Sequence, residues 1–418
     1  MPNRERIEQQ ILDRSNPSVW GETCILPDYN GYCIAGLAGW IEQLFCHQAS
    51  GSPLSNLTED LPPFEHVLLL VLDGLGYRKL QSLFERVPES TLSTLARDGL
   101  FLPLTSVFPS TTVAALASIA TGQTPLEHGL IGYRLYLRET SAITNMIRYS
   151  MVGNGRGEAA FHAGLDLETI LAGPTAQERL TQQGIETHTI LPQHIAGSGL
   201  SRTLYRGSTH VHQTVGLADM LVTARETLAR ATSRSFLSLY WPGLDTVAHV
   251  RGPHTEAYFA EWRVIDDALR RELVGRAGKT LLLLTADHGF VPMNPEDYIR
   301  LPAASDADGD LLLPPVGEPR ASYLYVRHGA KERVARALAG ASSDDGLVCV
   351  DSRTLIDDRL LGIGTPHPEI PRRLGDLAVV STGRAGVFHP YQDAVLLRGM
   401  HGGLTEQEML VPLIACSL

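Results

Sequence analysis

The chain has 418 residues, of which 44% are hydrophobic and 19% are charged, and its formal net charge is −11. This length and composition are those of an ordinary globular protein that can bury a large core. The negative charge disfavours stable nucleic-acid binding through the phosphate backbone. A small anionic substrate remains acceptable, because bound divalent cations would reverse the sign of the charge locally.

The cysteines and the N-terminal residues indicate a cytoplasmic protein. The five cysteines form no CxxC pair and no disulfide-like framework, which is typical of a reducing compartment. The first ten residues are charged, and no apolar signal region follows them. No apolar run approaches the ~20 residues that a membrane span needs. We therefore expect a cytoplasmic protein with no membrane segment.

Residues 1–62 are predicted to form a helical lead-in that packs on the core. Apolar residues between 33 and 45 recur at helical spacing, and a stretch rich in Pro and Ser closes the segment. A buried strand is expected at 66–72 and a helix at 77–86. Another helix is expected at 112–120, because Pro and hydroxyl residues directly precede it.

The remaining residues, 63–418, are predicted to form one α/β domain with two insertions. The first insertion, at about 140–235, is polar and rich in Gly and Thr, with helices at 174–184 and 217–232. We expect it to leave the sheet and to cap the site. The sheet resumes with strands at 236–241 and 280–285, separated by a helix at 255–273. The second insertion, 291–395, is expected to contain a helix at 331–338 and strands at 321–326, 347–350, 379–382 and 393–397.

Aspartates follow three of the predicted apolar strands. Asp73 ends the first, Asp245 and His249 follow the second, and Asp287 and His288 follow the third. A single Asp after a strand is usually a helix cap or a turn residue. Three of them, two with a histidine one or four residues later, are much harder to explain in that way. Because parallel strands bring their carboxyl ends to one edge of the sheet, we expect a metal site there.

The geometry of the chain around these residues supports the metal hypothesis. Asp245 and His249 lie one helical turn apart, so a helix starting at the strand end would direct both side chains at one ion. His401 lies among glycines that let the backbone approach closely, and we expect it to be the sixth ligand. Asp287 and His288 can both bind if the backbone turns sharply at Gly289. The mixed oxygen and nitrogen ligands suit a binuclear zinc site and tolerate Mn²⁺.

Three hydroxyl residues, Ser110, Thr111 and Thr112, precede or open the helix predicted at 112–120. The free N–H groups and the positive dipole end of a helix start favour a bound phosphate. A hydroxyl at that place becomes a good nucleophile if a metal binds it. The residues alone leave the choice among the three open, and a plain N-cap explains them equally well. His210 and His212 alternate along the chain and would share one face of a strand, for which a structural role is the simpler reading.

The order of these motifs resembles the alkaline phosphatase superfamily, and most closely its nucleotide pyrophosphatase/phosphodiesterase branch. The likeness covers roughly 63–135, 236–290 and 396–418, and it rests on a strand ending in Asp73, on Phe-Pro-x-x-Thr at 108–112, on Thr-Gly-x-x-Pro-x-x-His-Gly at 121–129, on Asp-x3-His at 245–249, on Asp-His-Gly at 287–289 and on His401. The C-terminal residues from Met400 onwards also resemble those of PglZ-type proteins.

The resemblance implies a doubly wound α/β/α sandwich with a mostly parallel central sheet and cap-like inserted subdomains. It implies that Thr112 is the nucleophile. It also implies that Asp245, His249 and His401 hold one zinc ion, and that Asp73, Asp287 and His288 hold the other, with Thr112 bridging toward it. The chain departs from the family at Ala115, where phosphodiesterase relatives carry an Asn that donates to a phosphoryl oxygen. The N–H groups of residues 112–113, Tyr133, Arg134 or a group from the cap are candidates to replace it.

The function expected from the residues and the resemblance together is metal-dependent hydrolysis of a phosphate diester or a nucleotide pyrophosphate through a phosphothreonine intermediate. The substrate would be a small anionic phosphoester, such as a nucleotide. A phosphate monoesterase of the same superfamily is the nearest alternative. A non-catalytic, metal-stabilised binding module is a third reading, which the full set of six ligands and a nucleophile disfavours.

Overall fold

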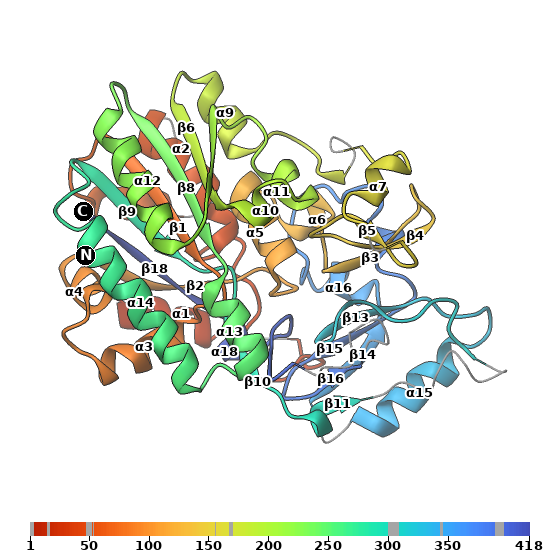
Figure 1. Ribbon diagram of the computed structural model, residues 1–418. Helices are drawn as coiled ribbons and strands as arrows, with labels where there is room; N and C mark the ends of the chain where they lie inside the picture. Colours follow the sequence, from red (N-terminus) through yellow and green to blue (C-terminus); the bar gives the residue numbers. More distant parts are fainter. Residues whose placement is uncertain are drawn as a thin grey trace.

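A computed structural model describes residues 4–14, 17–46, 52, 54–154, 156–166, 170–299, 309–342, 346–388 and 397–418. Its centre is a seven-stranded sheet in the order β2-β18-β9-β1-β8-β6-β7 (Figure 1). The strands are β1 (His66–Leu72), β2 (Leu100–Thr105), β6 (Glu186–Pro192), β7 (His210–Thr214), β8 (Ser235–Trp241), β9 (Thr280–Thr285) and β18 (Leu410–Ser417).

The register of the central strands brings their carboxyl ends together. β1 pairs in parallel with β8 and β9, with Leu72 opposite Trp241 and Val71 opposite Thr285. β6 and β7 continue the parallel arrangement beyond β8, whereas β18 runs antiparallel between β9 and β2. Residues that follow β1, β8 and β9 therefore leave the sheet at the same edge, as the sequence predicts.

Helices cover both sides of this sheet, so the fold is the expected α/β/α sandwich (Figure 1). On one side α14 (Glu256–Glu272) packs between α12 (Leu217–Arg230) and α4 (Thr91–Asp98), and α3 (Tyr77–Arg86) packs on β18. On the other side α2 (Leu37–Cys46) packs on α5 (Thr112–Thr121) and α9 (Ala176–Gln182). Burial of the apolar faces of these helices against the strands forms one large core.

The N-terminal segment contributes to this core. Ile7 and Ile11 of α1 (Arg4–Leu12) and Trp40 of α2 are buried in the same cluster as β1. A lead-in that packs on the core remains the description of 1–62 that we favour.

A second seven-stranded sheet lies beside the sandwich and joins the two predicted insertions. Its order is β14-β15-β13-β12-β3-β4-β5, and its neighbouring strands are antiparallel. The strands are β3 (Arg134–Leu137), β4 (Ala142–Asn145), β5 (Ser150–Met151), β12 (Val316–Glu318), β13 (Ala321–Leu324), β14 (Leu347–Asp351) and β15 (Leu377–Ser381). Gly317 of β12 pairs with Arg134 of β3, so this contact unites segments far apart in the sequence.

Shorter elements complete the described structure. The helices are α6 (Pro125–His128), α7 (Ala159–His162), α10 (Gln193–Ala196), α11 (Gly199–Leu204), α13 (Gly243–Arg251), α15 (Lys331–Ser342), α16 (Thr354–Asp357), α17 (Ile370–Arg373) and α18 (Glu406–Met409), with 3-10 turns at Ile34–Gly36, Ser55–Asp60 and Pro295–Asp297. The two-stranded pairs are β10 (Val291–Pro292) with β17 (Gly399–Met400), and β11 (Tyr298–Ile299) with β16 (Gly386–Val387).

One sequence prediction about the topology is wrong. Residues 140–235 were expected to lie outside the sheet, but β6 and β7 extend it at one edge. β7 is polar because it is the edge strand, and Val211 and His210 are exposed on it, whereas β6 is buried between β7 and β8 although it begins with polar residues. An edge strand that is open to water lacks the apolar run by which a central strand is recognised.

The other predicted elements in the described part of the chain are present, with boundaries shifted by a few residues. The strand expected at 393–397 falls almost entirely outside the described residues. Within the described ranges, the helices are all too short or too polar to cross a membrane.

Candidate active site

The six predicted ligands come from four parts of the chain and meet at the carboxyl edge of the central sheet. Asp73 directly follows β1, and Asp287 and His288 follow β9. Asp245 and His249 lie on α13, the helix that begins just after β8. His401 follows β17, whose pairing with β10 brings the C-terminal segment back to the site.

These side chains form two groups, each with its potential ligand atoms within 4.8 Å of one another. In the first group, the Nε2 atom of His249 lies 3.3 Å from Oδ1 of Asp245 and 3.3 Å from Nε2 of His401. In the second, Nε2 of His288 lies 3.5 Å from Oδ1 of Asp73 and 3.5 Å from Oδ2 of Asp287. The groups adjoin, because the rings of His288 and His401 stack with their centroids 3.6 Å apart.

The carboxylates leave oxygen atoms unsatisfied at the centre of each group. Asp73 Oδ1, Asp245 Oδ1 and Asp287 Oδ2 are buried and have no hydrogen-bond partner among the residues that the structure describes. The other oxygens of two of these carboxylates are occupied: Tyr240 donates its hydroxyl to Asp73 Oδ2, and the Gly74 and His288 N–H groups donate to Asp287 Oδ1. A buried oxygen without a donor is costly, and a bound cation would satisfy it. The residues therefore fit a pair of divalent metal ions.

The three imidazoles are oriented in the same way. Nδ1 of His249 contacts the Gly399 carbonyl oxygen at 2.8 Å, Nδ1 of His288 contacts that of Gly289 at 3.1 Å, and Nδ1 of His401 contacts that of Ser110 at 3.0 Å. A carbonyl accepts only from N–H, so each ring carries its proton on Nδ1 and presents a lone pair on Nε2. This is the arrangement by which proteins fix a histidine for metal binding.

The electrostatics of the site reflect three carboxylates in a water-poor setting. Burial, together with the charges of Asp245 and Asp287, raises the pKa of Asp73 well above its ordinary value. Burial also raises the pKa of Asp287, and it lowers the pKa of His401 well below its ordinary value, with the neighbouring His288 and His249 adding to the effect. Around Asp245 the balance is reversed, because His249 outweighs burial and lowers the pKa of that carboxyl. Positive charge in the centre would stabilise the ionised form of every carboxylate in it.

The structure distinguishes among the three candidate hydroxyls. Ser110 is buried and donates to the Gly403 carbonyl at 2.9 Å, and Thr111 is buried and donates to Glu318 at 2.5 Å. Thr112 is partly exposed, and its hydroxyl lies 3.2 Å from Nε2 of His288, in the second group. It is the first residue of α5, where the N–H groups of the opening turn have no partner within the helix. Of the three, only Thr112 faces the predicted metal centre.

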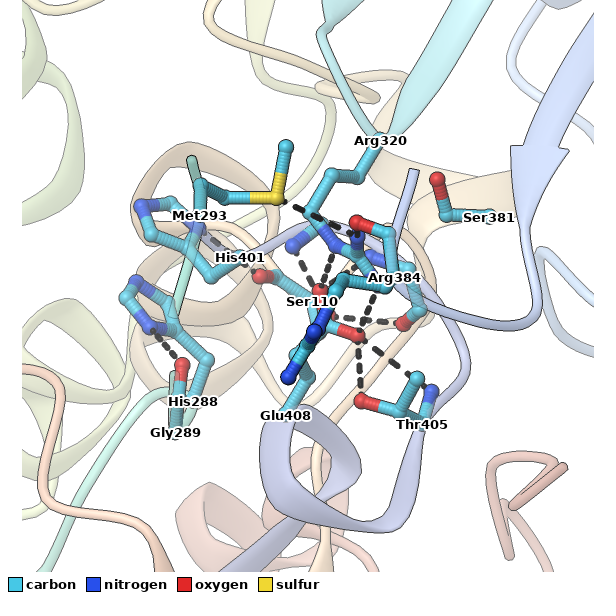
Figure 2. Close-up of polar contacts among 12 residues, drawn as sticks. Ser110, His288, Gly289, Met293, Arg320, Ser381, Arg384, His401, Thr405 and Glu408 are labelled. Atoms are coloured by element: carbon cyan, nitrogen blue, oxygen red, sulfur yellow. Dashed lines mark hydrogen bonds and ion pairs between the residues drawn. The ribbon is translucent and has the colours of Figure 1, made fainter. Parts of the chain in front are cut away.

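A fully buried ion pair holds the loops of the site in place (Figure 2). Arg320 donates to both carboxylate oxygens of Glu408, at 2.5 and 2.8 Å, and to the carbonyls of residues 383–385. Glu408 also accepts the Gly403 N–H at 2.9 Å. Ser110 in turn links the Gly402 N–H and the Gly403 carbonyl to the segment before Thr112. The pair therefore fixes the loop that carries His401 against the segment before Thr112.

Glycine is required at position 289 for a different reason from the one predicted. Its backbone φ is not positive, so the turn after His288 does not require left-handed geometry. A Cβ atom at this position would instead lie 2.0 Å from the Gln407 carbonyl oxygen and 2.9 Å from the Gly76 Cα. Glycine is needed there because three backbone segments approach closely behind the metal groups.

A cavity of about 210 Å³ opens onto Thr112, Asp73 and Asp245. One wall of the cavity is formed by α10, α11 and their neighbours, which lie within 140–235, the segment expected to cap the site; sequence reasoning named none of these lining residues, although His194 shortly follows β6. Apart from those three residues, the lining consists of apolar and uncharged polar side chains and one histidine: Leu116, Ile147, His194, Ile195, Ser198, Leu200, Ser201, Leu204, Tyr205, Tyr240, Pro242 and Thr246.

Ala115 is completely buried and does not line the cavity. Neither Tyr133 nor Arg134, the candidates considered for replacing the family Asn, is among the lining residues. The Tyr133 hydroxyl accepts instead from Asn145 at 2.7 Å, and the Tyr133 N–H donates to Glu318. The remaining candidates are the N–H groups at the start of α5 and the polar side chains of α10 and α11.

The comparisons with known proteins agree with this geometry. The family model for type I phosphodiesterase/nucleotide pyrophosphatase matches residues 67–404. The chain belongs to this family. It is a branch of the alkaline phosphatase superfamily, as the motifs indicate. No curated protein sequence gives a significant match to the chain.

Several solved structures share the fold. Murine ectonucleotide pyrophosphatase/phosphodiesterase 5 matches with a TM-score of 0.64 and 16% identity, over 84% of this chain and 87% of that one. An inactive form of the murine protein in complex with AMP matches with a TM-score of 0.63 and 15% identity, over the same shares of the two chains. Phosphonoacetate hydrolase from Sinorhizobium meliloti 1021, in complex with phosphonoformate, matches with a TM-score of 0.62 and 19% identity, over 85% and 90%.

Substitution of Glu408 tests whether the buried Arg320–Glu408 pair holds this site together. Glu408→Ala leaves the guanidinium buried without its partner, and we expect it to lower the free energy of unfolding by about 3–5 kcal/mol. Glu406→Ala is the matched control, because Glu406 forms a partly exposed pair with Arg78 and its loss should cost at most about 1 kcal/mol. Urea denaturation of both variants measures the two values. An equal loss of unfolding free energy in the two variants would contradict the structural role of the buried pair.

Proposed function

We propose that this protein hydrolyses phosphate diesters or nucleotide pyrophosphates through a phosphothreonine intermediate on Thr112. The observation that carries the proposal is the position of the Thr112 hydroxyl, which lies at the start of α5, beside His288 and at the wall of the cavity. Family membership supports a hydrolase of the phosphodiesterase and pyrophosphatase type.

The proposed reaction has two displacements. The Thr112 Oγ attacks phosphorus, a P–O bond forms, and the bond to the leaving alcohol or phosphate breaks. Water then attacks the phosphothreonine, which releases the product and restores the hydroxyl. Two divalent ions, held by Asp245, His249 and His401 and by Asp73, Asp287 and His288, would offset the charge of the phosphoryl group and favour the ionised hydroxyl. The N–H groups at the start of α5 are placed to receive a phosphoryl oxygen.

Zinc is the ion we propose, with Mn²⁺ as an acceptable substitute, because each group combines carboxylate oxygens with imidazole nitrogens. We also propose a cytoplasmic location, for which the five free cysteines are the support.

The charge of the cavity favours a diester over a monoester. A monoester is a dianion, and phosphatases of the superfamily add a cation to hold the extra charge. The cavity lining contains no lysine or arginine among the described residues. Arg320 is not available, since Glu408 and three carbonyls bind its guanidinium. Leu200, Leu204 and Tyr205 form a surface on which a second ester group can gain binding energy. The AMP complex of the murine neighbour makes a nucleotide a reasonable choice for that group.

The nucleophile is tested by three substitutions. Thr112→Ala should lower kcat by several orders of magnitude, because covalent catalysis fails without the attacking oxygen. Thr112→Ser should retain part of the activity. Thr111→Ser is the matched control: it keeps the hydroxyl that Glu318 accepts and should leave kcat within a few-fold of the wild type. A Thr112→Ala protein that keeps its rate would refute the assignment.

The metal requirement is tested by chelation and by metal content. Treatment with EDTA should abolish turnover, and added Zn²⁺ should restore it. Elemental analysis should find two ions in the loaded protein, and fewer in Asp245→Ala and His401→Ala, each of which removes one ligand of the first group. Addition of zinc should also raise the melting temperature, because the ion binds the folded site more tightly than the unfolded chain. Unchanged metal content in both variants would be inconsistent with the proposed ligand set.

The substrate class is tested with paired p-nitrophenyl esters at equal metal loading. We expect kcat/KM for bis-p-nitrophenyl phosphate or p-nitrophenyl thymidine monophosphate to exceed that for p-nitrophenyl phosphate. Leu204→Ala should narrow this difference, because it removes surface for the second ester group while leaving the reacting centre intact. A monoester advantage of tenfold or more would replace the diesterase with the phosphate monoesterase of the same superfamily.

A further inference from the structure

Three histidines and a glutamate gather at one edge of the central sheet, away from the active site. Glu186 and His188 belong to β6, and His210 and His212 belong to the neighbouring edge strand β7. We name these four residues the edge cluster. His188 lies opposite His210 in the parallel register, and Ile190 lies opposite His212. The proposed function uses none of the four.

The pleat of the two strands places the edge cluster on one face. Side chains at alternate positions of a strand point to the same side, so Glu186 and His188 share a face, as do His210 and His212. Thr187, between the first two, points the other way and contacts Thr181 of α9 through its hydroxyl at 3.0 Å. The cluster therefore lies on the side of the sheet opposite to α9. It is separate from the metal groups of the active site, which follow the carboxyl ends of β1, β8 and β9.

The imidazoles are close enough to act together. Nδ1 of His188 lies 3.2 Å from Nε2 of His212. Two ligand nitrogens that share a tetrahedral zinc ion, each roughly 2.0–2.1 Å from it, are about 3.3 Å apart. The ring of His210 stacks on that of His188 with the centroids 4.9 Å apart, and its side chain is 48% exposed, so it can turn toward its neighbours if it gives up its contact with Glu186.

Glu186 supplies the carboxylate that commonly accompanies histidine ligands. Its Oε1 lies 3.1 Å from Nε2 of His210 and 3.6 Å from Nε2 of His188. For His188 this is the ring nitrogen on the far side from His212. A carboxylate behind a ligating imidazole accepts its N–H, fixes the tautomer and raises its basicity toward the metal. The 3.6 Å contact is too long for a hydrogen bond, so Glu186 acts on His188 by its charge, from the side away from His212.

The histidines of the cluster are in the form that binds metal. Burial and the neighbouring His210 and His212 lower the pKa of His188 to about 4, against the opposing effect of Glu186. Burial and His210 lower the pKa of His212. Both rings are therefore neutral at pH 7, and neutral imidazole is the ligand for borderline divalent ions.

We propose that the edge cluster is a third metal site, which binds one Zn²⁺, Ni²⁺ or Cu²⁺ ion through His188 and His212, with His210 turning in as a further ligand. The site is half open to water, so solvent completes the coordination and the ion exchanges with solution. Its strand-edge position suggests a site that stabilises the β6–β7 edge and leaves the chemistry at Thr112 untouched.

The test counts metal ions in the full-length protein and follows their binding. The chain is first loaded with zinc and desalted, and is then titrated with Cu²⁺ and, in a separate experiment, with Zn²⁺. We expect the wild type to take up one ion beyond those of the active site, with nitrogen hyperfine structure in the Cu²⁺ electron paramagnetic resonance spectrum. His212→Gln should remove this ion or weaken its binding at least tenfold, and His210→Gln, at a half-exposed position, should weaken it as well.

Controls separate this site from the active site. His162→Gln changes an exposed histidine outside the cluster and should bind metal as the wild type does. Hydrolytic activity of the zinc-loaded His212→Gln and His210→Gln proteins should equal that of the wild type, because neither residue touches the cavity. Equal uptake by wild type and His212→Gln, or no ion beyond the active-site complement, would overturn the proposal. The difference between the two proteins does not depend on turnover, so failure of the proposed function would not alter the result.

Discussion

Three carboxylates with buried oxygens at one edge of one sheet impose the constraint on which the rest of the structure depends. Asp73, Asp245 and Asp287 each present a buried oxygen that has no donor among the described residues. Such a cluster is unstable by itself, since burial and mutual repulsion oppose ionisation. Backbone carbonyls orient three imidazoles toward the carboxylates, and these rings offset part of the cost of burying the charge. Bound cations would offset the rest. The divalent cations that we propose would supply the positive charge that this cluster lacks.

The surrounding structure keeps this arrangement rigid. The six proposed ligands come from separate parts of the chain, and residues 134–151 and 316–381 contribute the strands of a second sheet beside the first. From that sheet Arg320 reaches Glu408, and the buried pair anchors both the His401 loop and the segment before Thr112. A buried ion pair adds little net stability, but it favours the one arrangement of the chain in which both charges are paired. Here it fixes the position of His401 relative to Thr112, the proposed ligand and the proposed nucleophile.

The pairing of Arg320 with Glu408 also bears on the preference for diesters that we propose. Glu408 and three backbone carbonyls occupy the guanidinium of Arg320, and the described cavity lining contains no lysine or arginine. A singly charged diester then matches the site better than a doubly charged monoester. The wall that contacts the second ester group comes from α10 and α11, which follow β6 directly. β6 thus leads into the helices that line the cavity, and together with β7 it carries the edge cluster.

The sequence by itself determined the central strands, the edge at which their ligands emerge and the identity of all six ligand candidates. It could do so because apolar runs mark buried parallel strands, and because residues that follow such strands converge wherever the sheet is placed. The tertiary structure decided what depends on distant partners. It distinguished Thr112 from Ser110 and Thr111, because their local sequence is alike and only Gly403 and Glu318 show which hydroxyls are engaged. It placed β6 and β7 in the sheet, because β7 is a half-exposed edge strand without an apolar run and β6, although buried, begins with polar residues. It also paired Arg320 with Glu408 across 88 positions, because a buried ion pair leaves no local pattern in the chain.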